Sequence, residues 1–228
     1  MRTKIAILLI AICFCVISFR ICHFNRANYV ARKCSPSVAY VELYVSDYKI
    51  GSASGFLVAK GILMTAAHVT EHADRIDIYF ADSNEPYRSV DIITPDCNDD
   101  LGFVIFNADV NCPATLKFDN DIPYLGMDVI TIGSPLGREQ FNTISKGILS
   151  GIDRNFWDYG NPVYQIDAPT TFGNSGCPVF DGEGEVMGMV ISGYDNGDIC
   201  FCVTSMTLER EFSKFKNGLK RVESWEIK

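Results

Sequence analysis

Residues 170–180 read TTFGNSGCPVF, a short polar turn that runs into an apolar, strand-like segment. Ser175 lies between Gly173-Asn174 and Gly176. The glycines have two interpretations. They supply the positive φ that tight turns need, or they keep side chains away from a serine nucleophile and from the backbone N–H groups beside it. The rest of the chain has to decide between a turn and a nucleophile loop.

Strand-like segments dominate the chain beyond residue 35. They are short, rich in Val, Ile, Phe and Tyr, and separated by turn signals such as Asp181-Gly182 and Asn196-Gly197. Many short strands at near-regular spacing predict an all-β barrel or sandwich. The predicted strands are 38–45, 55–58, 76–80, 90–93, 101–106, 129–132, 143–149, 163–166, 186–192 and 199–204.

One helix is predicted near the end of the chain. Thr207 is its expected N-cap and Gly218 its expected end, because these residue types favour helix termini. The polar stretch 118–123 has no strand pattern and divides the body in two. We therefore expect one half at 36–118 and the other, with the helix, at 119–228. The apolar face of this helix consists of Leu208, Phe212 and Phe215.

The N-terminal segment differs from the rest of the chain. Residues 5–19 are apolar or small, follow Arg2 and Lys4, and extend to residue 22 if Arg20 snorkels. No A-x-A-like cleavage site follows, which favours a retained signal anchor over a cleaved signal peptide. We expect residues 1–35 to be this anchor or signal peptide with its basic flank, and the protein to be membrane-anchored or exported.

Charge excludes one class of partner. The first 33 residues hold six of the 20 basic residues and none of the 28 acidic ones, so the body is strongly acidic. Nucleic-acid binding needs a basic surface, and we expect none. No C-x-x-C pair is present, so structural zinc is not predicted either.

His68 ends a strand-like stretch and has two possible roles. Together with Glu71 and His72 it forms an H-x-x-E-H pattern, the signature of a zinc metallopeptidase, provided that both histidines share one helical face. Alternatively, His68 is the general base that a serine nucleophile requires. That role needs a carboxylate to orient the ring, and Asp100, at the start of an apolar strand, is the candidate. Asp99 is expected to face the other way.

The order His68, Asp100, Ser175 is that of chymotrypsin-type enzymes. Four stretches extend this likeness: GSASGFLVAKGILMTAAHV (51–69), DLGFVIF (100–106), VITIGSPLG (129–137) and GNSGCPVFDGEGEVMGMVISG (173–193). On these stretches the chain resembles the trypsin-like, chymotrypsin-fold serine peptidases, nearest the HtrA/Deg and glutamyl-endopeptidase branches.

The resemblance implies an all-β fold of two packed six-stranded antiparallel barrels. To these barrels the residue patterns above add a C-terminal α-helix and an N-terminal hydrophobic helix. It makes Ser175 the nucleophile, His68 the general base and Asp100 its orienting partner. The N–H groups of Gly173 and Ser175 would form the oxyanion hole. Protein or peptide substrates are implied, and no cofactor or metal.

Several positions depart from the family pattern. Asn174 replaces the aspartate that pairs with a freed amine in digestive members, so activation by that ion pair is not expected. The HtrA members continue into PDZ domains, and no such module is expected here. Val190 replaces the histidine of glutamyl endopeptidases, and Pro169 is not an acid, so preference for glutamate or for Arg and Lys loses support. The substrate pocket would be small or apolar, lined by Pro169, Val190, Ser192 and Gly193.

Two alternatives to a serine endopeptidase stay open at this point. The first is the zinc metallopeptidase built on residues 68–72. The second is a non-catalytic binding protein on a peptidase fold, which is disfavoured because all three triad residue types are present.

Overall fold

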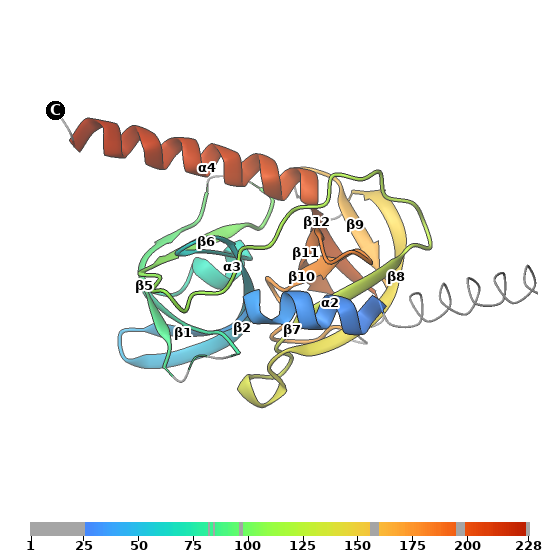
Figure 1. The fold of residues 1–228 in the computed structure, drawn as a ribbon, viewed down its shortest axis with the longest axis horizontal. Helices are drawn as coiled ribbons and strands as arrows, with labels where there is room; N and C mark the ends of the chain where they lie inside the picture. The colour runs from blue at the N-terminus through green and yellow to red at the C-terminus, as the bar shows by residue number, and fades with distance from the viewer. Residues whose placement is uncertain are drawn as a thin grey trace, which may run out of the picture.

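The computed structural model describes residues 26–81, 83, 85–95, 98–155, 160–194 and 199–226. These residues form two closed antiparallel barrels packed side by side (Figure 1). The first barrel contains β1 (Val38–Val45), β2 (Tyr48–Ala59), β3 (Ile62–Thr65), β4 (Arg75–Tyr79), β5 (Tyr87–Ile93) and β6 (Gly102–Phe106).

The second barrel repeats the topology of the first. Its strand order β7-β8-β9-β12-β11-β10 matches the order β1-β2-β3-β6-β5-β4. The predicted two-barrel fold is therefore confirmed. The strands are β7 (Asp128–Gly133), β8 (Thr143–Arg154), β9 (Val163–Ile166), β10 (Pro178–Phe180), β11 (Val186–Gly193) and β12 (Cys200–Thr204).

All ten predicted strand segments overlap a strand of the structure. The other two strands, β3 and β10, have four and three residues and coincide with the strand-like stretches that the sequence shows before His68 and after Gly176.

The barrels share apolar contacts. One cluster of buried side chains runs from Leu57 and Phe103 of the first barrel to Ile130 and Phe180 of the second. A second cluster around Ile166 fills the interior of the second barrel. Because interiors are close-packed, this shared core fixes the two barrels relative to each other, and so fixes any site between them.

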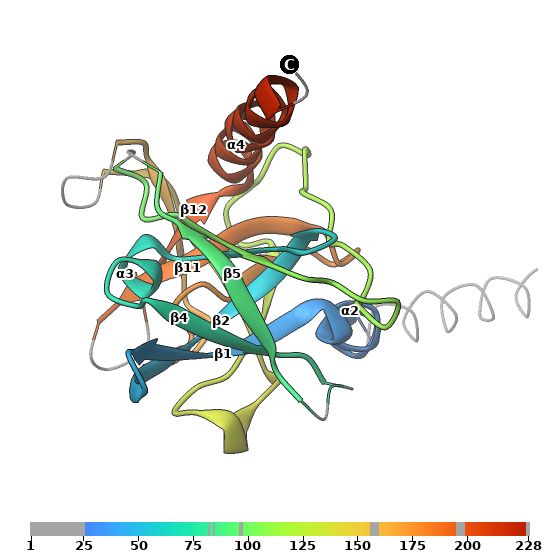
Figure 2. The same cartoon turned by 90° about the vertical axis from the view of Figure 1, so that its left-hand side faces the viewer.

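The C-terminal helix α4 (Ser205–Glu226) leaves the second barrel and runs over the first, as Figures 1 and 2 show. Its expected bounds are wrong at both ends. Thr204 Oγ1 accepts the Thr207 N–H (3.3 Å), so Thr204, not Thr207, caps the helix. Gly218 lies inside the helix rather than at its end. A Cβ there would meet nothing within 4 Å, so packing neither requires nor forbids a glycine.

Aromatic side chains attach α4 to the first barrel. The Phe215 ring stacks on Phe103 of β6 with ring centroids 4.2 Å apart, and Phe212 lies 6.0 Å from the same ring. Leu208 is fully buried. The predicted apolar face of the helix therefore covers the strand that follows Asp100.

Helix α2 (Arg26–Cys34) precedes the first barrel and leads into the 3-10 turn η1 (Ser35–Ser37). The sequence places these residues in a basic flank, yet Val30 and Cys34 are fully buried. The Cys34 thiol contacts the Gly184 carbonyl (3.4 Å) in the turn after β10. α2 is thus part of the folded body. A second 3-10 turn, η2 (Arg138–Gln140), lies between β7 and β8.

None of the described helices has the length and hydropathy of a membrane span. The apolar segment at residues 5–22, and with it the predicted N-terminal hydrophobic helix, lies outside the described residues.

Candidate active site

His68 lies on α3 (Ala67–Thr70), a single helical turn after β3. This turn packs directly on β6, because a Cβ at Gly102 would lie 2.5 Å from Thr70 Oγ1. Thr70 Oγ1 also donates to the Ala67 carbonyl (2.9 Å). A glycine on β6 therefore brings His68 close to the residues that precede that strand, Asp100 among them.

The His68 ring and the Asp100 carboxylate are in direct contact. His68 Nδ1 lies 2.8 Å from Oδ2 and 3.1 Å from Oδ1 of Asp100. The His68 backbone N–H also donates to Oδ1 (2.9 Å), so the carboxylate holds both backbone and ring. When Nδ1 carries the proton, Nε2 is the basic nitrogen of the neutral imidazole. This is the tautomer that a general base needs.

The surroundings of His68 move its pKa in opposite directions. Partial burial of the ring lowers the pKa. The hydrogen bond and the negative charge of Asp100 raise it, Glu71 adds a smaller contribution, and the net pKa lies above the ordinary value of 6.5. The carboxylate therefore stabilises the imidazolium that forms when His68 accepts a proton.

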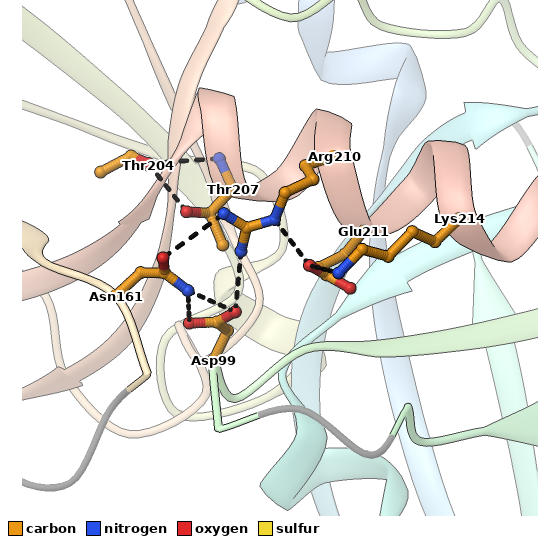
Figure 3. Close-up of polar contacts among 7 residues, drawn as sticks. All are labelled: Asp99, Asn161, Thr204, Thr207, Arg210, Glu211 and Lys214. Atoms are coloured by element: carbon orange, nitrogen blue, oxygen red, sulfur yellow. Dashed lines mark hydrogen bonds and ion pairs between the residues drawn. The ribbon is translucent and has the colours of Figure 1, made fainter.

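Asp100 has φ +50°, a left-handed conformation that few non-glycine residues adopt. Its neighbour Asp99 is 4% exposed and belongs to a separate polar network (Figure 3). Asn161 Nδ2 donates to both carboxylate oxygens of Asp99, at 2.8 and 3.0 Å. Arg210 Nη2, on α4, donates to Oδ2 at 3.3 Å. The loop that carries Asp100 is thus tied to the loop before β9 and to the C-terminal helix.

Two consecutive β-turns carry Ser175. The turn at 171–174 is closed by a 3.0 Å hydrogen bond, and the turn at 174–177 by one of 2.8 Å. The third residue of each turn is a glycine with positive φ, +96° at Gly173 and +82° at Gly176. This is the glycine position of a type II turn. The turn interpretation of the glycines is therefore confirmed, and these turns place Ser175 between them.

Gly173 is required by its surroundings as well as by its φ. A Cβ there would lie 2.5 Å from the Ser134 carbonyl oxygen. Within the described part of the chain, the N–H groups of Gly173 and Ser175 donate to no protein atom. They are therefore free to bind an incoming oxygen.

Cys177, two residues after Ser175, is fully buried. Burial raises the pKa of its thiol far above the ordinary range, so Cys177 is unsuited to act as a second nucleophile.

A cleft of about 640 Å³ brings the predicted residues together. His68 from the first barrel and Ser175 from the second both line it, whereas Asp100 is not among its lining residues and contacts His68. Two exposed aromatic residues that the sequence did not single out, Phe172 and Tyr194, also line it. The predicted pocket residues are all among the lining residues: Pro169, Val190, Ser192 and Gly193.

The geometry does not favour the zinc pattern at residues 68–72. α3 ends at Thr70, so His68 and His72 do not share the helical face that the H-x-x-E-H signature requires. Asp100 also occupies Nδ1 of His68. Among the described residues, no group of three or more His, Cys, Asp or Glu side chains is placed to hold a metal ion.

A His-Asp pair on one antiparallel barrel and a serine loop on the other, meeting at one cleft, define the class of chymotrypsin-like two-barrel peptidases. A family model described as "Trypsin-like peptidase domain" matches residues 53–189. The chain belongs to this family.

Individual relatives are serine proteases. The chain is 34% identical over 146 residues to a probable periplasmic serine endoprotease, DegP-like, of Halomonas elongata, across 63% of this chain and 30% of that protein. It is 28% identical over 218 residues to serine protease HTRA3 of Mus musculus, across 89% of this chain and 46% of that protein. The chain therefore spans less than half the length of these two relatives.

A solved structure shows the same fold. The serine endoprotease from Yersinia pestis superposes with a TM-score of 0.72 at 24% identity, covering 82% of this chain and 65% of that one. At this level of identity the similarity supports only the fold.

Proposed function

We propose that this chain is a serine endopeptidase in which Ser175 is the nucleophile, His68 the general base and Asp100 its orienting partner. One observation carries the proposal. The Asp100 carboxylate binds Nδ1 of His68, and this oriented ring lines the same cleft as Ser175. A serine hydroxyl is a weak nucleophile at its free pKa and needs such a base.

In the first step Ser175 Oγ attacks the carbonyl carbon of the scissile peptide bond. Its proton moves to Nε2 of His68, and Asp100 stabilises the resulting imidazolium. The carbonyl oxygen becomes an oxyanion that accepts hydrogen bonds from the N–H groups of Gly173 and Ser175. Such donors stabilise charge that develops only in the transition state.

The tetrahedral intermediate then collapses. His68 returns the proton to the leaving amine, the C–N bond breaks, and Ser175 is left as an ester with the acyl half of the substrate. Water attacks this ester with His68 again as base, which releases the carboxylate product and restores Ser175. Every proton in this sequence is carried by His68, and no cofactor is needed.

The cleft favours neutral side chains beside the scissile bond. Its described lining residues include no Asp, Glu, Lys or Arg. With Pro169, Val190, Ser192 and Gly193 on its walls, we expect valine peptides to be cleaved faster than arginine or glutamate peptides. Faster cleavage after a charged residue in a peptide library would contradict this pocket assignment.

For location, we propose a membrane-anchored or exported protein. The support is the apolar segment at residues 5–22, together with the word periplasmic in the name of the Halomonas relative. Fractionation of cells that express the full chain, followed by N-terminal sequencing, tests this. A membrane-bound protein that retains Met1 supports an anchor, and a shortened exported protein supports a signal peptide. A soluble, non-exported chain that retains Met1 would contradict both.

Active-site labelling tests the proposed chemistry. A fluorophosphonate probe should add one phosphonyl group per chain, on Ser175, and Ser175→Ala should abolish the label without changing the circular dichroism spectrum. Ser145→Ala and Ser192→Ala are matched controls, because both serines line the same cleft and should leave labelling intact. An unlabelled but folded wild-type chain, or a label on another serine, would overturn the proposal.

A further inference from the structure

Ser54 links the first barrel to the nucleophile loop of the second. It lies on β2 and is fully buried. Its hydroxyl donates to the Gly173 carbonyl (2.7 Å) and accepts the Ser134 N–H (2.9 Å). Its own backbone N–H donates to the Ser175 carbonyl (3.0 Å). One residue of the first barrel thus contacts the carbonyl groups of both residues that would form the oxyanion hole.

These contacts restrict the peptide unit between Gly173 and Asn174. The carbonyl of this unit, that of Gly173, accepts a hydrogen bond from the Ser54 hydroxyl. The N–H of this unit, that of Asn174, donates to the Thr171 carbonyl (3.0 Å). Because a peptide unit is planar, bonds at both ends fix its rotation. This unit joins the two neighbouring units that carry the N–H groups of Gly173 and Ser175, so its orientation sets how those groups point. Gly173 alone would not hold this geometry, since glycine leaves a positive-φ conformation at little cost.

The Ser54 side chain has few alternative partners. Its hydroxyl is enclosed between Gly173 of the loop and Ser134 at the end of β7. Thr65 Oγ1 binds the Ser54 carbonyl (2.7 Å) and so holds its backbone in place. A donor that is fully buried and held in place is suited to hold one loop conformation.

We propose that Ser54 is a positioning residue for catalysis: its hydroxyl holds the oxyanion hole in the formed state from across the barrel interface. This inference rests on the proposed function and deepens it. A positioning role differs from a purely stabilising role in what it predicts: loss of the Ser54 hydroxyl should weaken binding of the transition state more than binding of the substrate.

The test compares Ser54→Ala with Ser37→Ala. Ser37 is a matched control, since it is also buried (3% exposed) and donates to a backbone carbonyl, that of Ala114. For each full-length variant, kcat and KM are measured with a valine p-nitroanilide peptide, and Ki with the matching peptide aldehyde, whose adduct needs the oxyanion hole. Thermal unfolding is measured in parallel.

We expect Ser54→Ala to lower kcat about tenfold to a hundredfold, less than the loss of a donor itself. The aldehyde Ki should rise by a similar factor while KM changes by about twofold or less. Ser37→Ala should lose comparable thermal stability and keep both kcat and the aldehyde Ki. A Ser54→Ala enzyme as active as Ser37→Ala would overturn the inference.

A second variant covers failure to fold. Ser54→Cys keeps the shape of the side chain but donates weakly, so it should fold and show an intermediate loss of kcat. Wild-type kcat in Ser54→Cys would overturn the inference if Ser54→Ala does not fold. An inactive wild type would overturn the proposed function and this inference with it, whereas an active wild type with fully active Ser54 variants overturns this inference alone.

Discussion

The loop that carries Asp100 and the loop that carries Ser175 are both held from outside their own barrel, but by different interactions. Charged and amide groups of Arg210 and Asn161 hold the first loop through Asp99, and the Arg210 side chain is 44% exposed. A neutral, fully buried hydroxyl, that of Ser54, holds the second.

This difference has a consequence for each loop. Partly exposed ion pairs are screened by salt and contribute little free energy, whereas a buried hydrogen bond is costly to break. We therefore expect the Asp100 loop to tolerate loss of its anchor and the Ser175 loop not to.

The largest effect should follow Asp100→Asn. An asparagine can donate to Nδ1 of His68 and so favours the tautomer that cannot act as base, which should lower kcat about 10⁴-fold with little change in KM. Steady-state kinetics measure it. Asp99→Asn is the matched control one residue away, and an equal loss there would show that the loop as a whole matters rather than the His68 contact.

Gly173→Ala, in the loop that carries Ser175, should have the next largest effect. The added Cβ would collide with the Ser134 carbonyl, at 2.5 Å, and alanine disfavours φ +96°. Loss of one oxyanion donor should cost about 10²- to 10³-fold in kcat. The matched control is Gly126→Ala, also a positive-φ position but with nothing within 4 Å of the new Cβ. Full activity in Gly173→Ala would contradict the assigned oxyanion hole.

Arg210→Met should have a much smaller effect. It removes the ion pairs with Asp99 (3.3 Å) and Glu211 (2.8 Å) but keeps much of the packing of α4. Because each of these carboxylates keeps another partner, the free energy of unfolding should fall by about 1 kcal/mol or less and kcat by about twofold to fivefold. Both losses should shrink in high salt. Lys214→Met removes only a contact to Glu211 (2.8 Å) and should leave kcat unchanged. A kcat loss as large as that of Ser54→Ala would reverse the ranking of the two anchors.

The smallest expected effect concerns the pKa of His68. Because Asp100 raises it, the protonated ring favours the folded state. That contribution is complete below the unfolded pKa of about 6.5 and is lost as pH rises through the higher folded value. In NMR titrations of the Ser175→Ala background, the His68 pKa should lie above 6.5 and fall when Asp100→Asn is added. An unchanged pKa would contradict the charge assigned to this contact.

Much of the fold could be predicted from the sequence, because the strands and turns depend mainly on residues that are close together in the chain. Strand-forming residue types and turn residues located β1 and β9 at their observed bounds, and four local motifs carried the resemblance that proposed His68, Asp100 and Ser175. The bounds of α4 were wrong because the Thr204 cap and the internal Gly218 leave ambiguous signals. Cap preferences mark residue types and do not say which neighbouring threonine binds the free N–H.

The anchors of the two loops could not be predicted. Ser54 and Gly173 lie 119 residues apart, and Asp99 and Arg210 lie 111 apart. No local spacing marks such pairs, because they meet only when two barrels and a terminal helix pack together. Phe172 and Tyr194 belong to the same case, since their place in the cleft depends on the register of strands far away in the chain.

Trapping of the acyl-enzyme tests the central claim most directly. The full chain is mixed with p-nitrophenyl acetate, quenched in acid within milliseconds to seconds, and analysed by intact mass and peptide mapping. We predict one acetyl group per chain on Ser175, formed more slowly in Asp100→Asn and in Ser54→Ala and absent from Ser175→Ala. A folded wild-type chain with no adduct, or with the acetyl group on another residue, would contradict the account.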